Sequence, residues 1–214
     1  MKCDKKAMLL YAVTDRAWVG KQTLYEQVEC ALKGGATCIQ LREKSLGKTE
    51  FLKEAIQLSA LCKKYHVPFI VNDNVEVALQ SHADGVHVGQ EDMKATKVRE
   101  LIGDSMILGV SCHTLEEALH AQQEGADYLG VGAVFTTSTK QNTISVSYDT
   151  LQKISQAITI PIVAIGGISK ENLPKLSGSG VDGVALVSAI FSATDITEET
   201  RELRTLSEQM VQSR

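Results

Sequence analysis

Pro161-Ile-Val-Ala-Ile-Gly-Gly-Ile168 is the stretch that decides the fold, because a short apolar run in it leads directly into two glycines. An amphipathic, helix-like stretch follows over residues 170–177, and then a second apolar run over residues 183–187. Continuous apolar runs of this length are typical of strands buried on both faces of a parallel sheet. The stretch therefore predicts a strand–helix–strand unit with a right-handed crossover.

The same unit recurs along the whole chain. The predicted strands cover residues 9–13, 38–41, 69–71, 85–88, 107–110, 128–131, 162–165 and 183–187. The helix-like stretches cover residues 24–33, 48–64, 75–81, 93–101, 115–124, 148–157, 170–177 and 195–211. Eight such units are the number that closes into a barrel.

A doubly wound open sheet is the alternative arrangement of these units. Such a sheet usually carries a glycine-rich turn directly after its first strand. Here Val13 is followed by Thr14-Asp15-Arg16, which contains no glycine. The sequence therefore predicts an α/β fold, with a single TIM (β/α)8 barrel domain over residues 1–214.

Composition narrows the class of protein. The 214 residues carry a formal net charge of −4, with 43% hydrophobic and 22% charged residues. The apolar fraction is that of a globular protein, and the acidic balance argues against nucleic acid as the main partner. No run of about 18 apolar residues exists, so we expect no membrane-spanning helix. The five cysteines form no Cys-x-x-Cys pair, which is typical of buried thiols in a cytoplasmic protein rather than of disulfides or a zinc site.

Cationic residues follow the second predicted strand. In an extended segment, alternation places Gln40, Arg42 and Lys44 on one side. Two cations and an amide on one side can bind a polyanion. The alternative is a solvated loop in which Arg42 pairs with Glu43.

Two carboxylates follow the third and fourth predicted strands. Asp73 and Asp92 can converge on the rim of a barrel, since those strands are neighbours. Carboxylates that share a site repel each other unless a cation lies between them, and Mg²⁺ is typically held by one or two carboxylates plus substrate phosphates. The alternative is that Asn72-Asp73 forms a turn and caps the helix that starts at Val75.

The loops after the seventh and eighth strands commonly form a phosphate site in this fold. Gly166-Gly167 and Ser188-Ala189 occupy those positions, and residues 188–191 can supply the short extra helix. Glycine lets backbone N–H groups approach phosphate oxygens, and a helix dipole adds to the attraction. Residues 136–140, Thr-Thr-Ser-Thr-Lys, form either a loop that closes over a ligand or a plain surface loop. Two anion sites on one rim indicate a transferase with two phosphorylated substrates.

An ordered set of motifs, one at almost every strand end, resembles the thiamine phosphate synthase family. The motifs are Tyr11-Ala-Val-Thr-Asp15, Gln40-Leu-Arg-Glu-Lys44, Asn72-Asp73, Ala83-Asp-Gly-Val-His-Val-Gly-Gln-Glu-Asp92, Gly109-Val-Ser-Cys-His113, Gly125-Ala-Asp-Tyr128, Thr137-Ser-Thr-Lys140, Pro161-Ile-Val-Ala-Ile-Gly-Gly-Ile168 and Val187-Ser-Ala-Ile190. The resemblance implies a TIM barrel that joins a hydroxymethylpyrimidine, from its diphosphate, to the nitrogen of a thiazole phosphate. It also implies a dissociative route through a carbocation-like pyrimidine, with thiamine phosphate and diphosphate as products.

The resemblance implies site residues as well. The pyrimidine diphosphate would contact Gln40, Leu41, Arg42, Glu43, Lys44, Asn72, Ser111 and Lys140. The thiazole phosphate would contact Thr137, Ser138, Thr139, Gly167, Val187 and Ser188. Mg²⁺ would be bound by Asp73 and Asp92, and the catalytic residues would be Arg42, Lys44, Ser111 and Lys140. His87 and His113 are expected to be structural, because the bond-forming step needs no general base.

Three positions depart from the family pattern: Asn74 in place of Arg, Ala133 in place of Pro, and Gln141 in place of Lys. Two rival functions stay open, a thiazole tautomerase of the same family and a barrel that binds thiamine phosphates without catalysis. The complete diphosphate and metal set favours the synthase. The expected partners are the two small-molecule substrates, with neither nucleic acid nor membrane, and the pattern of residues 195–211 leaves a monomer and a homodimer open.

Overall fold

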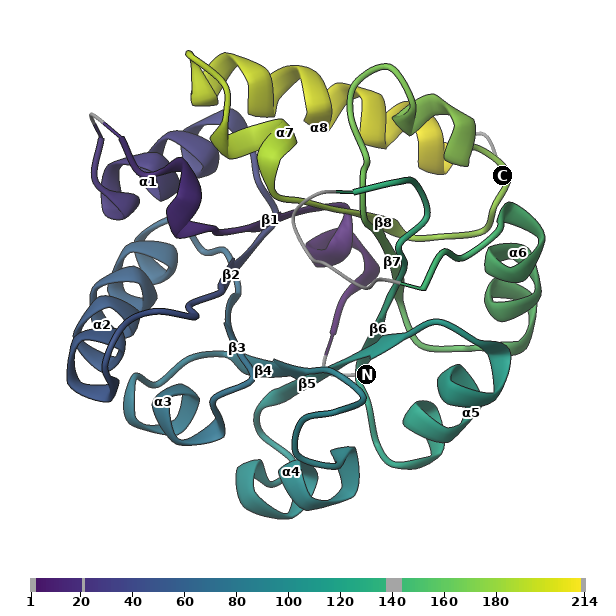
Figure 1. Cartoon of the computed structure of the whole chain (residues 1–214), viewed down its shortest axis with the longest axis horizontal. Coiled ribbons are helices and arrows are strands. Elements are labelled where there is room, and N and C mark those ends of the chain that lie inside the picture. Colours follow the sequence, from purple (N-terminus) through teal and green to yellow (C-terminus); the bar gives the residue numbers. More distant parts are fainter. Residues whose placement is uncertain (1–2, 21, 138–143, 213–214) are drawn as a thin grey trace.

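A computed structural model describes residues 3–20, 22–137 and 144–212. It contains a closed barrel in which each parallel strand pairs with the next and β8 pairs with β1. Figure 1 looks along the barrel and shows the helices as an outer ring around the strands. The predicted TIM (β/α)8 barrel is therefore confirmed. Among the described residues, no helix is both long and apolar enough to cross a membrane.

The eight strands lie where the apolar runs predict them, with small differences at their ends. They are β1 Leu10–Val13, β2 Cys38–Leu41, β3 Phe69–Asn72, β4 Gly85–Val88, β5 Ile107–Cys112, β6 Tyr128–Val131, β7 Ile162–Ile165 and β8 Gly183–Leu186. The largest difference is β5, which extends to Cys112 and so includes Ser111. A four-residue strand spans only about 13 Å, so the barrel is shallow and its two ends lie close together.

The outer helices also follow the sequence pattern. They are α1 Leu24–Gly34, α2 Lys48–Lys64, α3 Val75–Gln80, α4 Ala95–Ile102, α5 Leu115–Gln123, α6 Tyr148–Ala157, α7 Ser188–Phe191 and α8 Ile196–Gln212. The short helix expected after the eighth strand is α7. Helix α8 packs against α1 and η3 (Leu173–Leu176), so it covers the outside of the barrel (Figure 1).

One predicted helix is wrong. Residues 170–177 form only the short 3-10 helix η3, Leu173–Leu176. Pro174 lies at the start of this segment, where it has no N–H to donate, and Gly178 follows with a positive φ of 76°. The connection between β7 and β8 therefore makes a single tight turn instead of a full helix.

Helix ends show which polar residues act as caps. Asn74 caps α3 by accepting a hydrogen bond from the Val77 N–H at 3.0 Å. The expectation that Asn72-Asp73 caps this helix is therefore wrong by one residue. Thr114 caps α5 as its sequence indicates, and Gly35 ends α1 with the left-handed φ of 101° that glycine adopts freely.

The N-terminal end of the barrel is held by a repeated hydrogen bond. In each of four strand pairs, the residue before the even-numbered strand accepts a hydrogen bond from a backbone N–H in the first two residues of the preceding strand. The pairs are Thr37 with Leu10 (2.8 Å), Asp84 with Phe69 (2.9 Å), Asp127 with Leu108 (2.9 Å) and Asp182 with Ile162 (2.9 Å). The 3-10 helix η1, Lys5–Met8, contacts β1 and β8 at this end, and Met8 is buried in the barrel core.

Candidate functional site

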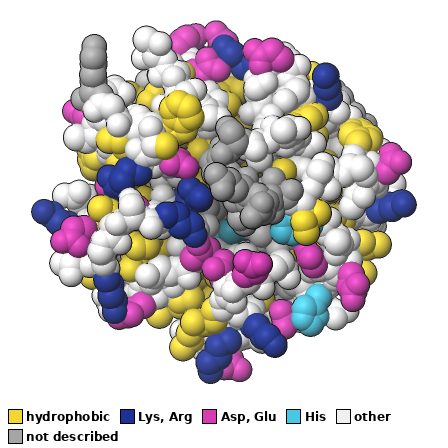
Figure 2. Space-filling view, in the orientation of Figure 1, with side chains coloured by type: hydrophobic (Ala, Val, Ile, Leu, Met, Phe, Trp, Pro, Cys, Tyr) yellow, Lys and Arg dark blue, Asp and Glu magenta, His cyan; other side chains and the backbone are white. Residues whose placement is uncertain are grey.

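Charged residues gather at the carboxyl ends of β1 to β4. Figure 2 shows basic and acidic side chains meeting near the middle of this face. A cavity of about 350 Å³ lies there, lined by Asp15, Arg16, Ala17, Arg42, Glu43, Lys44 and Ser45. That volume is at the lower end of the range of about 300–1,000 Å³ usual for small-molecule sites. The cavity lies where the sequence predicts binding of a polyanion.

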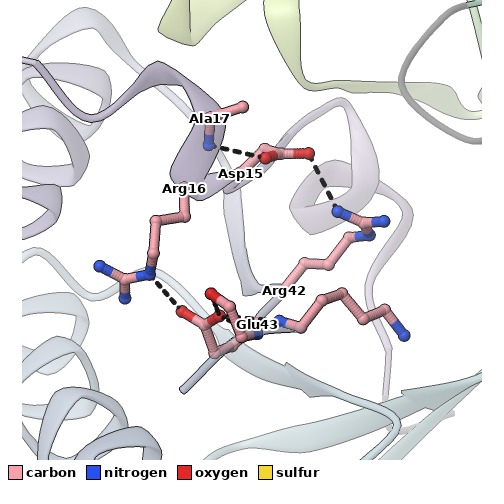
Figure 3. Close-up of a pocket in the computed structure, with 7 residues that line it drawn as sticks. Asp15, Arg16, Ala17, Arg42 and Glu43 are labelled. Atoms are coloured by element: carbon pink, nitrogen blue, oxygen red, sulfur yellow. Dashed lines mark hydrogen bonds and ion pairs between the residues drawn. The ribbon is translucent and has the colours of Figure 1, made fainter.

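Arg42 lines this cavity, and its ion-pair partner differs from the one expected for a solvated loop. Its guanidinium Nη1 lies 3.0 Å from the Asp15 carboxylate, which also accepts a hydrogen bond from the Ala17 N–H (Figure 3). The proposed pairing of Arg42 with Glu43 is therefore wrong. Only 23% of the Arg42 side chain is exposed, so Asp15 holds the guanidinium in a defined position at the rim.

Glu43 has a different partner and a different orientation. Its Oε2 lies 2.6 Å from Arg16 Nε (Figure 3), and its Oε1 accepts hydrogen bonds from the backbone N–H groups of Lys44, Ser45 and Leu46. Burial alone would raise the pKa of Glu43. The hydrogen bonds from Ser45 and the ion pair with Arg16 outweigh it and lower the pKa to about 2. Glu43 thus fixes the loop that carries Lys44.

The residues before the loop lie on opposite sides of β2. Gln40 is buried inside the barrel, where its Nε2 donates to the Tyr11 hydroxyl at 2.8 Å. Leu41 is fully buried in the core between strands and helices. The Leu41 side chain is therefore turned away from the barrel interior, and only its backbone can face a ligand.

Asp73 and Asp92 meet at the rim, as predicted. Asp73 has a left-handed φ of 62°, and its Oδ2 lies 2.5 Å from Lys44 Nζ. Asp92 accepts a hydrogen bond from the Gly89 N–H at 2.7 Å. Burial raises the pKa of Asp73, Lys44 opposes this shift, and the neighbouring Asp92 carboxylate raises the pKa further.

This carboxylate pair fits Mg²⁺ better than a metal held by protein ligands alone. Among the described residues, no group of three or more His, Cys, Asp or Glu side chains is placed to hold a metal. Two carboxylates suit an ion that takes its remaining oxygens from water and a substrate phosphate. Asp73 and Asp92 would hold that ion, and the oxygen-only donor set agrees with magnesium.

Asn72 and Ser111 lie on β3 and β5, the two strands that flank β4. Asn72 ends β3, opposite His87 of β4 in the register. The Ser111 hydroxyl on β5 lies 2.9 Å from His87 Nε2, and its carbonyl accepts a hydrogen bond from Gln90. Ser111 thus lies at the rim, and the buried His87 contacts its hydroxyl from the barrel interior.

A second cavity of about 340 Å³ lies at the ends of β6, β7 and β8. It is lined by Thr136, Thr137, Gly167, Ile168, Ser169, Ser188, Ala189 and Ser192. None of these described lining residues is charged. Lys170 is the next residue in the chain, but its Nζ lies 2.8 Å from both Glu199 and Glu202. The cavity therefore presents hydroxyls and backbone groups to a ligand.

Gly167 lines this second cavity at a close approach between two loops. Its φ is +66°, and a Cβ added there would lie 2.2 Å from the Thr136 carbonyl oxygen. The loop after β6 reaches this point because Val134 and Phe135 donate backbone hydrogen bonds to Ile165 and Gly166. Any side chain on Gly167 would push that loop away, so the close approach requires glycine.

The other residues expected at this second cavity are only partly described. Val187 precedes the first residue of α7, Ser188, and both are half-buried beside the cavity. Ser138, Thr139 and Lys140 lie outside the described residues. The contact of Lys140 with a pyrimidine substrate therefore stays a prediction.

The roles of several buried and half-buried polar residues were not predicted from the sequence. Asp15 and Arg16 position Arg42 and Glu43, while Tyr11 and Tyr128 form hydrogen bonds inside the barrel. The tyrosine hydroxyls are the sequence feature that could have predicted these bonds, since a polar group in a buried strand needs a hydrogen-bond partner. Burial raises the pKa of Cys112 to about 12, so its thiol stays protonated and is unsuited to nucleophilic attack.

Comparison with known proteins agrees with the fold and the site. The family model described as thiamine monophosphate synthase matches residues 10–190. The thiamine-phosphate synthase of Clostridioides difficile is 48% identical over 198 residues, covering 92% of this chain and 94% of that protein. The corresponding protein of Clostridium acetobutylicum is 46% identical over 192 residues, or 90% and 91% of the two chains.

A solved structure extends the likeness to three dimensions. The thiamine phosphate pyrophosphorylase of Pyrococcus furiosus superposes with a TM-score of 0.89 at 40% identity, over 97% of this chain and 98% of that one. Its barrel therefore matches this one over almost its whole length. The chain belongs to the thiamine monophosphate synthase family of enzymes.

Proposed function

We propose that this enzyme transfers the hydroxymethylpyrimidine group from its diphosphate to the nitrogen of a thiazole phosphate, with Mg²⁺ as cofactor. The products are thiamine phosphate and diphosphate. The observation that carries the proposal is the presence of two different cavities on one barrel rim, one lined by charged side chains and one whose described lining residues are all uncharged. Family membership agrees with this reaction, because the curated relatives are named for it.

The charged cavity suits the leaving diphosphate. Arg42 and Lys44 reach the rim from the loop after β2, where Asp15 and Asp73 hold their charged ends. Both cations would stabilise the negative charge that grows on the diphosphate as its bond to carbon breaks. Bound Mg²⁺, held by Asp73 and Asp92, would supply further positive charge to the same oxygens.

The neutral cavity suits the thiazole phosphate. Its hydroxyls and backbone N–H groups can bind a phosphate without adding a second cluster of cations beside the first. Thr137, Gly167, Val187 and Ser188 would hold this substrate close to the pyrimidine. Held there, the thiazole nitrogen reaches the cationic carbon before water does.

A direct assay tests the proposal. Purified protein is mixed with both phosphorylated substrates and Mg²⁺, and the products are separated by chromatography. We expect thiamine phosphate and diphosphate in equal amounts, and none when Mg²⁺ is chelated. Absence of product with fresh substrates would overturn the proposal. Isomerisation of a thiazole precursor in the same preparation would then favour the tautomerase alternative.

A further inference from the structure

A continuous chain of hydrogen bonds crosses the barrel interior beneath the charged cavity. It links Gln40 of β2, Tyr11 of β1, Tyr128 of β6, His87 of β4 and Ser111 of β5. The four donor–acceptor distances are 2.8, 2.8, 2.9 and 2.9 Å. We propose that this chain fixes the direction of the Ser111 hydroxyl, so that Ser111 donates a hydrogen bond to the bound substrate instead of accepting one.

The direction is set at Gln40. Its Nε2 carries hydrogens and no free lone pair, so it can only donate to the Tyr11 oxygen. In the proposed direction Tyr11 uses its own hydrogen for the next bond, to the Tyr128 oxygen, a contact in which either hydroxyl can be the donor. In the same direction Tyr128 donates to His87 Nδ1, which lies 2.9 Å away and accepts only when the ring hydrogen is on Nε2. Each bond in this series therefore points from β2 toward β5.

His87 passes the same direction to Ser111. In the proposed direction Nδ1 accepts from Tyr128, which requires the His87 tautomer with its ring hydrogen on Nε2. The Nε2–H then donates to Ser111 Oγ at 2.9 Å. The Ser111 hydroxyl hydrogen is left for an acceptor atom above the rim. His87 and Tyr128 are thus positioning residues, which refines the expectation that His87 is structural.

The surroundings keep the chain in this state. Tyr11 and Tyr128 are almost completely buried, and burial raises the pKa of both phenols well above their ordinary value. Both hydroxyls therefore stay protonated and available as donors. The centres of their rings lie 5.8 Å apart, and the His87 ring lies 5.4 Å from that of Tyr128, so the three side chains are packed together around these bonds.

The choice of donor matters for the reaction proposed above, on which this inference rests. Pyrimidine nitrogens and diphosphate oxygens are acceptors, and the diphosphate oxygens gain charge as the bond to carbon breaks. A donating hydroxyl stabilises that charge, whereas a hydroxyl whose hydrogen is used by His87 does not. The chain thus prepares Ser111 before the substrate arrives.

Nitrogen-15 NMR of histidine-labelled protein without substrate tests the direction itself. The His87 resonance is assigned by its loss in His87→Gln. We expect hydrogen on Nε2 and a bare, hydrogen-bonded Nδ1 in the wild type, and loss of that Nδ1 hydrogen bond in Tyr128→Phe. Tyr65→Phe is the matched control, because Tyr65 bonds Glu29 outside the barrel. Hydrogen on Nδ1 of wild-type His87 would overturn the proposal, whether or not the protein makes thiamine phosphate.

A double-mutant cycle tests the link to turnover. We expect Tyr128→Phe to lower kcat about five- to tenfold, as loss of one oriented hydrogen bond would. In the Ser111→Ala background the same change should lower kcat less than about twofold, because Tyr128 acts through Ser111. Equal losses in both backgrounds would contradict this role. The NMR result separates failure of this inference from failure of the proposed reaction.

Discussion

The two cavities on the barrel rim meet an anion with different groups. At the ends of β1 to β4, charged side chains face the ligand, and each is held by a carboxylate: Arg42 by Asp15, and Lys44 by Asp73. At the ends of β6 to β8, the described lining is hydroxyls, glycine and backbone. The nearest cation in sequence, Lys170, is paired with Glu199 and Glu202.

The difference matches the two phosphorylated groups of the proposed reaction. The charge on one group changes during the reaction, and the charge on the other does not. A diphosphate that leaves gains charge, so cations and a metal beside it contribute most in the transition state. A phosphate far from the reacting atoms keeps its charge, and neutral donors suffice to hold it. The charged side chains of the rim therefore lie beside the group on which negative charge develops. Four predictions test this division.

The largest expected effect is at the carboxylate pair. We expect Asp92→Ala to lower Mg²⁺-dependent turnover at least about a hundredfold, because the metal loses one of its two protein ligands. Asp92→Asn keeps an acceptor for the Gly89 N–H but loses the charge, and should fall almost as far. Initial rates across a Mg²⁺ titration measure this, with Glu91→Ala as the control. Full activity in Asp92→Ala would show that the pair does not bind the metal.

The next effect concerns stability of the charged loop. Glu43→Gln should lower the free energy of unfolding by about 2 kcal/mol at pH 7, because Arg16 loses a buried counter-ion. The native pKa of Glu43 is depressed from 4.5 to about 2, so its stabilisation is full above pH 4.5 and is lost as the pH falls toward 2.

Urea unfolding between pH 7 and pH 3 measures this loss. Glu54→Gln is the matched control, since Glu54 also pairs with Arg16 but is more exposed. An equal loss in both variants would mean that the deeper burial of Glu43 adds nothing to its ion pair with Arg16.

The neutral cavity should respond to a change of shape instead. Gly167→Ala places a Cβ 2.2 Å from the Thr136 oxygen, so the loop must move. We expect the KM for the thiazole phosphate to rise about tenfold, while the KM for the pyrimidine diphosphate stays within about twofold. Gly103→Ala is the matched control, because Gly103 has a similar φ of +60° and open space around it. A rise in both KM values would show that the two cavities are not independent.

The smallest effect is the response to salt. Raising NaCl from about 0.05 to about 0.5 M shortens the Debye length from over 10 Å to under 5 Å. We expect the KM for the pyrimidine diphosphate to rise a few-fold more than the KM for the thiazole phosphate. Steady-state kinetics at constant Mg²⁺ measure both values. Equal salt dependence would argue against the difference between a charged and a neutral cavity.

The strands were predictable because the physical signal is local. A strand such as β7 is buried on both faces, and four apolar residues in a row show this directly. The failure at residues 170–177 is also local in origin, because Pro174 and Gly178 favour a turn and outweigh the amphipathic pattern. The meeting of Asp73 and Asp92 followed from the fold, since neighbouring strands end at one rim.

The pairing of side chains was less predictable. Glu43 is adjacent to Arg42 in sequence, yet it pairs with Arg16, because the loop turns between the two residues. The link from Gln40 to Ser111 runs through three other strand residues on the barrel interior and depends on ring positions across the barrel. Such contacts are set by packing in three dimensions, which apolar patterning does not encode.

The repeated hydrogen bond at the N-terminal end has a consequence for how this protein can diverge. Thr37, Asp84, Asp127 and Asp182 each close one strand pair, and they lie at the opposite end of the strands from both cavities. We therefore expect substitutions at these four positions to change the stability of the barrel more than its turnover. Selection for stability and selection for turnover can then act on opposite ends of the strands.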